Sequence, residues 1–324
     1  MPAGVSRVLK SGVAWAGWRI PCPLAGAPVI LLYHGVPRKT KAGRVDAKAF
    51  QEQIFFLRQH FELIDAEGEA SQRNGRPQVL LTFDDGFRNN YDVVRPILQR
   101  YQAPAVFFVN SRHAERGKYL WFAYLRVLED WFPADKFSFR GEVFSMTAEN
   151  RRRSMARLQQ QLLDLRPHPQ AMYAAIEREL PALSDFLSEG RIADLCAGMT
   201  EDQVRELSAD PLFRVGCHTV DHPFLSRAER GDMAWQLAEN KRWIESLTGR
   251  VCDMVAYPSG DYDSVVLSAC RDLGFTRGYA VIPASRTPAA EELPRIGIYG
   301  PSLDVLGFVG RWGSLLRAMR VPMG

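Results

Sequence analysis

The chain has 324 residues, 46% of them hydrophobic and 24% charged, and its formal net charge is +4 at pH 7. This composition is typical of a globular protein with a large core, and it excludes a disordered chain, a collagen-like repeat and a small disulfide scaffold. The densest basic stretch is Arg151-Arg152-Arg153, which is too short to indicate a nucleic-acid partner.

Residues 1–27 are expected to form an N-terminal segment. Their apolar stretch from Gly12 to Trp18 is too short to cross a membrane and lies at the lower limit for a signal-peptide core. The five cysteines of the chain are an odd number without C-x-x-C spacing, which favours a reducing compartment. We therefore expect a cytoplasmic protein, with export as the alternative. The stretch from Val5 to Trp18, with two tryptophans and basic flanks, would also suit a peripheral contact with the inner membrane.

From residue 28 onward, short apolar runs alternate with amphipathic helical stretches, which is typical of β/α units around a parallel sheet. Asp46 is a good N-cap for a helix over residues 47–60, and Gly249 would end a helix from Gly231 to Thr248. A third helix is expected from Tyr91 to Tyr101. The predicted strands cover residues 29–33, 79–83, 105–109, 213–216, 254–257 and 276–281.

The region from about Arg112 to Ala197 interrupts this alternation. It contains long stretches of helix-forming residues, such as Arg151 to Leu165, and few strand signals. We therefore expect a helical insertion over about residues 112–197, within a single domain that spans residues 28–324. The sequence Thr200-Glu201-Asp202-Gln203 then has the form of a capping box and starts the regular pattern again.

A pair of carboxylates stands at the end of a predicted strand, in Thr82-Phe83-Asp84-Asp85-Gly86. Adjacent carboxylates repel each other, so one of them is driven towards protonation unless a cation neutralises the pair. A metal ion would make the arrangement tolerable. The alternative is an ordinary turn that ends the strand, since Asp and Gly favour turns.

A pair of histidines follows a later strand, in His218-Thr219-Val220-Asp221-His222. The spacing predicts both imidazoles on one side of a helical turn, an arrangement by which two histidines bind zinc in other motifs. The alternative is a pair of histidines in a solvent-exposed loop.

Both features lie at strand carboxyl ends, which converge on one face of a parallel sheet or barrel. One carboxylate and two imidazoles would give a three-ligand site for a divalent metal, with a position left for water, as in catalytic sites. The other carboxylate is then free to take a proton from that water. Zinc is the expected ion for such ligands, and cobalt or nickel would also fit.

The motifs T-F-D-D-G and H-T-x-x-H, in this order after strands, closely resemble the first two motifs of the polysaccharide deacetylases, the NodB-homology or carbohydrate esterase family 4 enzymes. The resemblance covers most of residues 28–300. It implies a distorted (β/α)7 barrel with Asp84 as the catalytic base and Asp85, His218 and His222 as the metal ligands. It also implies a carbohydrate substrate, from which an N-acetyl group on an amino sugar of a polysaccharide or glycan precursor is hydrolysed.

The third motif of that family, R-x-P-Y, corresponds here to Ala256-Tyr257-Pro258-Ser259. The arginine that orients the base is absent, whereas the backbone N–H of Ser259 matches the position that helps to bind the oxyanion. We assign Tyr257, Pro258 and Ser259 to the oxyanion and substrate site, with a Pro-Ser-Gly turn as the alternative. Arg295, on another strand, is the candidate for replacing the missing arginine, and a surface ion pair is its alternative role.

The C-terminal Leu-x-His motif of the family, which supplies the catalytic acid, is also missing, because no histidine follows His222. Tyr33-His34-Gly35, at the end of the first strand, resembles the early Tyr-His motif of the biofilm-polysaccharide deacetylases, whose motif order is circularly shifted. The resemblance implies that His34 is the general acid. A structural histidine at a strand end is the alternative.

Other histidines and aromatic residues carry weaker signals. Three histidines have no partner motif and are expected to be surface or packing residues: His60, His113 and His168. Three aromatic residues would suit stacking on a sugar, but their helical spacing is more typical of the core face of a helix: Trp121, Phe122 and Tyr124.

Three other functions fit this pattern less completely. Removal of a formyl group from a lipid-linked amino sugar would use the same site and release a different acid. A glycosidase is disfavoured, because the adjacent Asp84 and Asp85 cannot easily straddle a glycosidic bond at a separation of roughly 5–9.5 Å. A non-catalytic carbohydrate-binding relative would explain the two incomplete motifs, but it would not need a base beside an open metal site. The sequence does not indicate an oligomeric state.

Overall fold

The computed structural model describes residues 28–41, 43–68, 76–115, 118–165, 169–281, 289–303 and 306. The predicted N-terminal segment of residues 1–27 lies outside this part of the chain, as does His168. None of the helices in the described ranges combines the length with the apolar character that crossing a membrane requires.

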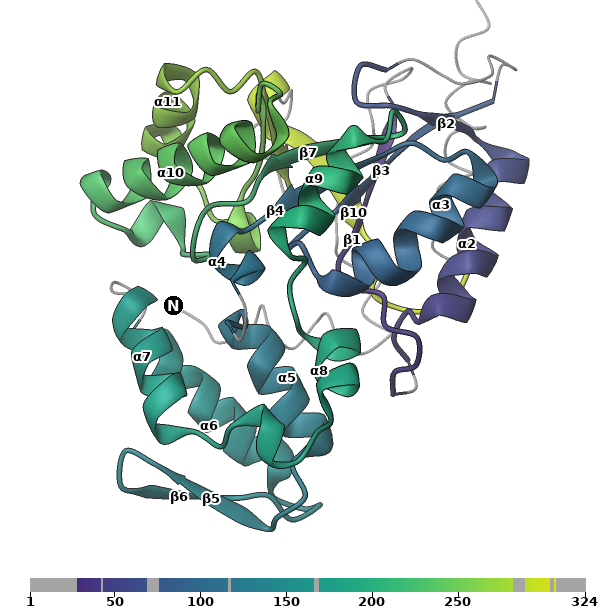
Figure 1. Ribbon diagram of the computed structural model, residues 1–324. Helices are drawn as coiled ribbons and strands as arrows, with labels where there is room; N and C mark the ends of the chain where they lie inside the picture. Colours follow the sequence, from purple (N-terminus) through teal and green to yellow (C-terminus); the bar gives the residue numbers. More distant parts are fainter. Residues whose placement is uncertain are drawn as a thin grey trace, which may run out of the picture.

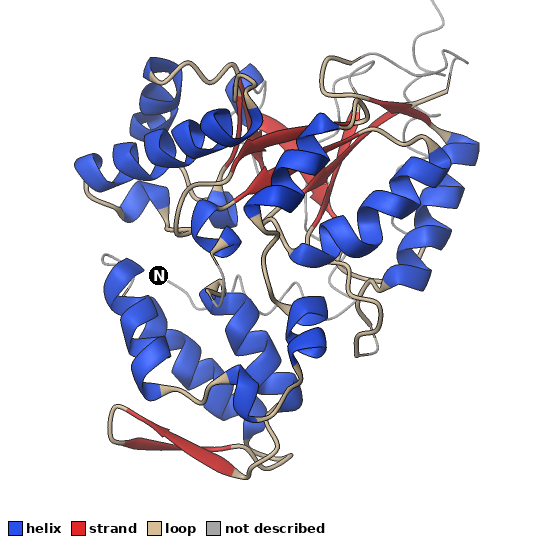
Figure 2. Cartoon of the chain, viewed as in Figure 1, coloured by secondary structure: helices blue, strands red, loops and turns tan. Residues whose placement is uncertain are grey.

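Seven strands form a closed parallel barrel: β1 (Val29–Tyr33), β3 (Gln78–Phe83), β4 (Ala105–Val109), β7 (Phe213–Cys217), β8 (Met254–Ala256), β9 (Arg277–Ala280) and β10 (Leu293–Gly297). Their order is β1-β10-β9-β8-β7-β4-β3, and pairing of β1 with β3 closes the ring. Figure 2 shows the strands in red, with helices in blue beside them. A short strand, β2 (Glu62–Ile64), adds to the start of β3. Since β7 and β8 share only the pair Cys217–Val255, the barrel is irregular at this seam. The distorted (β/α)7 fold implied by the resemblance is therefore confirmed.

Helices cover the outside of the barrel, and their ends follow the predicted signals (Figure 1). The side chain of Asp46 accepts a hydrogen bond from the backbone of Ala49 at the start of α2 (Ala47–His60). Thr200 and Gln203 form a complete capping box at the start of α9 (Glu201–Ala209), and α10 (Arg230–Thr248) ends at Gly249, whose φ is 66°. The remaining helical elements around the barrel are η1 (Asn90–Val94), α3 (Arg95–Tyr101), η3 (Leu225–Arg227), η4 (Pro258–Gly260), α11 (Ser264–Asp272) and η5 (Ala290–Glu292).

Strand alternation determines which side chains reach the active end of the barrel. Successive side chains of a strand point to opposite faces, so every second residue of each strand points into the barrel. The larger core cluster joins one set of strand residues to the helices. The other set forms a smaller cluster inside the barrel: Ile30, Leu80, Val106, Phe108, Met254, Ala256 and Tyr279, with Ile64 of β2. His34 and Asp84 have the same parity as Ile30 and Leu80, which directs them towards the interior at the carboxyl ends of β1 and β3.

The segment between β4 and α9 folds beside the active end of the barrel, with an apolar core of its own (Figure 1). Its helices are α4 (Ser111–Ala114), α5 (Trp121–Trp131), α6 (Arg151–Leu163), α7 (Pro169–Glu179), η2 (Leu183–Asp185) and α8 (Glu189–Leu195). We call residues 111–195 the insertion. The expectation of helices alone was incomplete, because β5 (Lys136–Phe139) and β6 (Glu142–Ser145) form an antiparallel hairpin. Arg140 and Gly141, both with positive φ, make the tight turn that joins the two strands.

Candidate active site

The predicted site residues lie in loops at the carboxyl ends of the barrel strands, and several of these loops are strained. The described chain has six non-glycine residues with positive φ, and four of them are Asp85 (76°), Thr219 (68°), His222 (56°) and Ser259 (56°). Such backbone conformations cost about 1–3 kcal/mol each and cluster at functional sites. The fold therefore holds these loops in conformations that the local sequence alone would disfavour.

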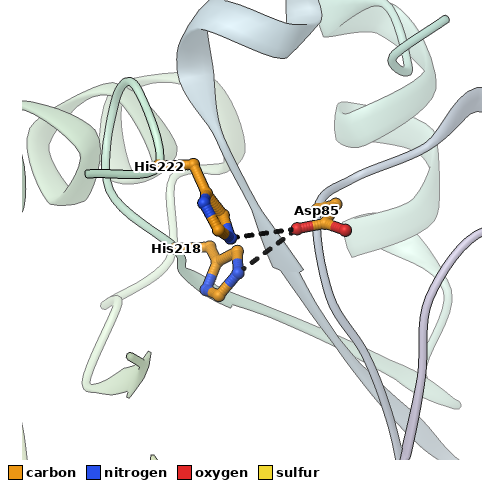
Figure 3. A group of neighbouring side chains, drawn as sticks. All are labelled: Asp85, His218 and His222. Carbon is orange, nitrogen blue, oxygen red and sulfur yellow. Dashed lines mark ion pairs between the residues drawn. The ribbon is translucent and has the colours of Figure 1, made fainter. Parts of the chain in front are cut away.

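Three of the residues form a compact group of possible metal ligands (Figure 3). The Oδ1 atom of Asp85 lies 3.4 Å from Nε2 of His218 and 3.6 Å from Nε2 of His222. One ligand atom from each residue fits within 4.8 Å of the other two, and all three side chains are buried. The expectation of a helical turn was wrong, because the residues after β7 form an irregular loop in which Thr219 and His222 have positive φ.

The donor atoms of this group suit a divalent cation. Both carboxylate oxygens of Asp85 and Nδ1 of His222 are buried without a hydrogen-bond partner. Buried polar atoms are rarely left unpaired, so an unpaired carboxylate at the centre of a His/Asp group fits the binding of a cation. Nδ1 of His218 lies 2.8 Å from the carbonyl oxygen of Ala256, to which it can donate. In the neutral ring this bond places the proton on Nδ1, and Nε2 is then free to act as a ligand.

The charges of the group are strongly coupled. Burial lowers the pKa of His218, but Asp84 and Asp85 raise it more, so that its pKa lies above the ordinary 6.5. Burial lowers the pKa of His222 to about 4, even though Asp85 opposes this shift. Burial raises the pKa of Asp85, whereas the neighbouring imidazoles of His218, His34 and His222 lower it more, so that Asp85 is ionised at neutral pH.

Asp84 is paired with Arg295 inside the barrel. The guanidinium donates from Nη1 to Oδ1 (2.7 Å) and from Nη2 to Oδ2 (2.8 Å), a bidentate pair in which both residues are buried. Burial raises the pKa of Asp84, but Arg295 and then His218 lower it more, so the carboxylate stays ionised. Arg295 thus reaches Asp84 from β10, as expected of a residue that replaces the missing motif arginine, and it is not a surface ion pair.

His34 faces the same end of the barrel. Its ring stacks on Tyr299, which follows β10, at a centroid distance of 5.7 Å and an interplanar angle of 29°. Burial lowers its pKa, the charges of Asp85 and Asp84 oppose this, and Arg126 and Arg295 add to it. The net pKa lies below 6.5, so the ring is mostly neutral at pH 7. The electrostatic coupling to both aspartates agrees with a position beside the metal-ligand group.

The residues of the third motif divide between the site and the core. Ser259 is exposed in η4, immediately after β8, whose Ala256 carbonyl holds His218. Pro258 is buried at the start of η4. The side chain of Tyr257 is directed elsewhere, since its hydroxyl donates to the carbonyl of Glu291 (2.8 Å) and its ring stacks on Tyr262. Only the backbone of Tyr257 is therefore available to a substrate.

A cavity of about 670 Å³ opens between the barrel loops and the insertion. His34 and Tyr299 line it from the barrel, and Trp121, Phe122 and Arg126 line it from α5. The ring of Phe122 also packs against His222, with ring centroids 4.8 Å apart. Of the three aromatic residues singled out in the sequence, Trp121 and Tyr124 are buried in the core of the insertion, and Phe122 is the one in contact with a candidate ligand.

His113, expected to be an ordinary surface or packing residue, contacts the backbone of the candidate metal ligand Asp85 directly. It is 1% exposed, and its ring nitrogens lie 2.8 Å from the carbonyl oxygens of Asp85 and Cys196. The backbone bonds Arg88 N–H to Ala197 O and Met199 N–H to Gly86 O tie the same two segments together. The chain leaving the insertion therefore holds the loop that carries Asp85.

A second support of this kind reaches the loop of His222. The Tyr173 hydroxyl, from α7, donates to the carbonyl of Asp221 at 3.1 Å. Gln236 accepts from the backbone N–H groups of Val220 and Asp221 and donates to the Asp221 carboxylate. Arg112 stacks on Tyr173, with its guanidinium carbon 4.0 Å from the ring centroid. No local sequence signal identifies these residues, because each acts through a partner far along the chain.

The closed parallel barrel carries an aspartate pair, a histidine pair and a cavity at the carboxyl end of its strands, where the active sites of barrel enzymes lie. The polysaccharide deacetylase sequence profile matches residues 71–278, well over half of the chain. The chain therefore belongs to the polysaccharide deacetylase family.

Several proteins resemble the chain along most of its length. The Streptococcus pyogenes deacetylase PplD, solved in complex with acetate, is 19% identical with a TM-score of 0.55, and the match covers 86% of this chain and 96% of PplD. IcaB from Ammonifex degensii is 18% identical with a TM-score of 0.54, covering 88% and 96% of the two chains. The Bacillus subtilis (strain 168) protein YxkH is 19% identical over 315 residues, which make up 95% of this chain and 81% of YxkH.

Proposed function

We propose that the protein is a metal-dependent carbohydrate deacetylase that hydrolyses the N-acetyl group of an amino sugar to acetate and a free amine. The observation that carries this proposal is the unpaired buried carboxylate of Asp85 beside His218 and His222, with the ionised Asp84 next to it. Membership of the polysaccharide deacetylase family supports a carbohydrate substrate.

Some of the site residues would bind a metal ion, and others transfer a proton. Asp85, His218 and His222 would hold a divalent ion, with zinc as the first choice for two imidazoles and a carboxylate. Such an ion, when bound, supplies a Lewis acid that polarises the acyl carbonyl and lowers the pKa of water. Asp84 accepts a proton from the attacking water, and Arg295 keeps Asp84 ionised and fixed in orientation.

The acyl oxygen and the leaving nitrogen need separate partners. The backbone N–H of Ser259, in the exposed turn after β8, donates to the oxyanion that forms as water attacks the acyl carbon. His34, which lines the cavity, donates a proton to the departing nitrogen. Burial lowers the pKa of His34, so that its protonated ring is a stronger acid than an ordinary imidazolium, and the charges of Asp85 and Asp84 partly oppose this loss of the protonated form.

The test joins metal content to product release. The purified protein, a His218→Ala/His222→Ala double variant and a His60→Ala control are analysed for bound divalent metal and for acetate and formate released from N-acylated amino sugars. We expect about one ion per chain in the wild type and the control, none in the double variant, and acetate release that follows the metal content. His60 is a matched control because it is exposed at the end of α2.

Two results would contradict the proposal. Absence of metal from the wild type after reconstitution with zinc, cobalt or nickel would remove the hydrolytic site. Release of formate without acetate would keep the metal chemistry and replace the substrate by a formylated sugar.

A further inference from the structure

Among the described residues, Arg126 is a cation of the insertion that lines the cavity without a close ion pair, although Asp85, Asp130 and Glu129 act on its charge at longer range. Arg126, on α5, lines the cavity and is exposed to it. Arg44 lines the same cavity, but its guanidinium lies 2.6 Å from Asp130, which Lys41 also approaches at 3.8 Å. Among the described residues, Arg126 has no carboxylate within 4 Å, although Glu129 is one turn further along α5 and lines the cavity as well.

Arg126 shares the cavity with the proposed general acid, His34. Burial lowers the pKa of His34, and the positive charge of Arg126 lowers it further. The negative charges of Asp85 and Asp84 oppose this shift. Arg126 therefore lies within electrostatic reach of the proposed general acid. His34 and Arg126 line the same cavity, one from the end of β1 and the other from the facing helix.

The charges of the barrel residues are already compensated. Asp84 is neutralised by its bidentate pair with Arg295, and Asp85 would be neutralised by a cation between it and the two histidines. Neither aspartate is then available as the partner of Arg126. An arginine that is unpaired in a cavity of this size is suited to an oxyanion of a ligand, since its planar fork matches phosphate and carboxylate.

We propose that Arg126 binds an anionic group, a phosphate or a carboxylate, carried by the amino sugar or by the residue next to it. This inference rests on the proposed function and narrows its substrate class from N-acetylated sugars in general to acidic ones. Half-buried Phe122 and exposed Tyr299 line the cavity on either side and offer ring faces to the apolar side of the sugar.

The test compares matched neutral and acidic substrates. These are the methyl glycoside of N-acetylglucosamine, N-acetylglucosamine 1-phosphate, and a disaccharide that links N-acetylglucosamine to glucuronic acid. We expect a higher kcat/KM for the phosphate or the carboxylate compound than for the methyl glycoside. Arg126→Gln should reduce this preference roughly ten- to hundredfold, the effect of losing a charge-assisted hydrogen bond, and Arg126→Lys should reduce it less.

The control and a binding measurement make the result decisive. Arg152→Gln removes the same charge from an exposed position on α6 outside the cavity lining, so it reports general electrostatic attraction only. Affinities of the three sugars are also measured by calorimetry in an Asp84→Asn background, with and without Arg126→Gln. A binding preference that depends on Arg126, without acetate release by the wild type, would support the acidic ligand and overturn the deacetylase function. Acetate release without preference for an acidic sugar, or with a preference that survives Arg126→Gln, would overturn the role of Arg126.

Discussion

The barrel and the insertion face each other across the cavity, and they contribute different kinds of side chain to it. Strand alternation in the barrel delivers ionisable residues that are paired within the fold, such as Asp84 with Arg295. The insertion lines the cavity with aromatic and cationic side chains, among them Phe122 and Arg126 of α5. This difference indicates that the chemistry belongs to the barrel and that contacts with the rest of the substrate belong to the insertion.

The two regions are nevertheless coupled through the loops that carry the metal ligands. His113 lies against the carbonyl of Asp85, and Tyr173 donates to the carbonyl of Asp221, next to His222. Both side chains belong to the insertion, His113 to α4 and Tyr173 to α7. The insertion therefore supports the loops of the candidate ligands without supplying one of them, and substitutions can separate this support from the proposed chemistry.

The largest effect is expected from a change in the barrel alone. Asp84→Asn removes the proposed base, so kcat should fall about 10²- to 10⁴-fold while the metal content is retained. The matched control is Asp194→Asn on α8, because Asp194 is also a buried aspartate beside an arginine, with Arg191 at 3.2 Å. If both variants lost activity equally, buried aspartates in either region would matter only for folding and the division between the regions would fail.

The next effect concerns the stability of the barrel interior. Arg295→Met leaves Asp84 buried without its partner, and we expect a loss of about 3–5 kcal/mol in the free energy of unfolding at pH 7. The guanidinium is what holds the pKa of Asp84 down against burial, so its removal raises this pKa. The deficit should shrink as the pH falls, because protonation removes the unpaired charge. Urea titrations at several pH values measure this, and a deficit independent of pH would indicate lost packing alone.

In the wild type, Asp84 has the opposite effect on how stability depends on pH. The pKa of Asp84 is depressed in the folded state, so its contribution to stability is fully present above the pKa of the unfolded chain, about 3.9. That contribution is lost only as the pH falls further, through the folded pKa. The double variant Arg295→Met/Asp84→Asn should recover part of the stability lost at pH 7, since it carries no buried charge at this position.

The sequence is most informative where local physics decides the structure. The strands over residues 29–33 and 105–109 were predicted to the residue, because short apolar runs that are bounded by turns and rich in β-branched or aromatic residues favour a buried strand. The N-cap at Asp46 and the capping box at Thr200 were also confirmed, since each is a hydrogen bond within one turn. The hairpin over residues 136–145 was missed because its strands are only four residues long.

The site depends more on contacts between distant residues, which no local pattern determines. Arg295 and Asp84 are 211 positions apart, and only closure of the barrel brings them together. The motif spacing also misled in one respect, because a left-handed backbone at Thr219, rather than a helical turn, brings the rings of His218 and His222 to 5.0 Å. The supports from His113 and Tyr173 depend on how the insertion packs on the barrel, which becomes visible only in the folded chain.

A moderate effect of pH on metal affinity is expected. It tests the electrostatic coupling between His218 and Asp84 in the barrel. Below the raised pKa of His218, a bound proton must leave before the imidazole can act as a ligand, so affinity should fall about tenfold per pH unit. His222, with a pKa of about 4, should add to this slope only near that pH. Competition with a chelator between pH 5 and 8 measures the slope. Asp84→Asn should move its onset to lower pH, because Asp84 raises the pKa of His218; an unchanged onset would contradict this coupling.

The smallest effect is expected from removing one hydrogen bond between the insertion and the loop of His222. A second variant removes a similar bond within the insertion, so that the effect on metal binding can be separated from the effect on stability. Tyr173→Phe removes the hydrogen bond to the Asp221 carbonyl and keeps the ring on which Arg112 stacks. Tyr124→Phe removes an equivalent bond, from the Tyr124 hydroxyl to the Pro181 carbonyl (2.7 Å), inside the insertion. Each variant should lose about 1 kcal/mol of stability, but only Tyr173→Phe should weaken metal binding, up to about fivefold. Equal metal affinities in the two variants would mean that the insertion packs beside the ligand loop without positioning His222.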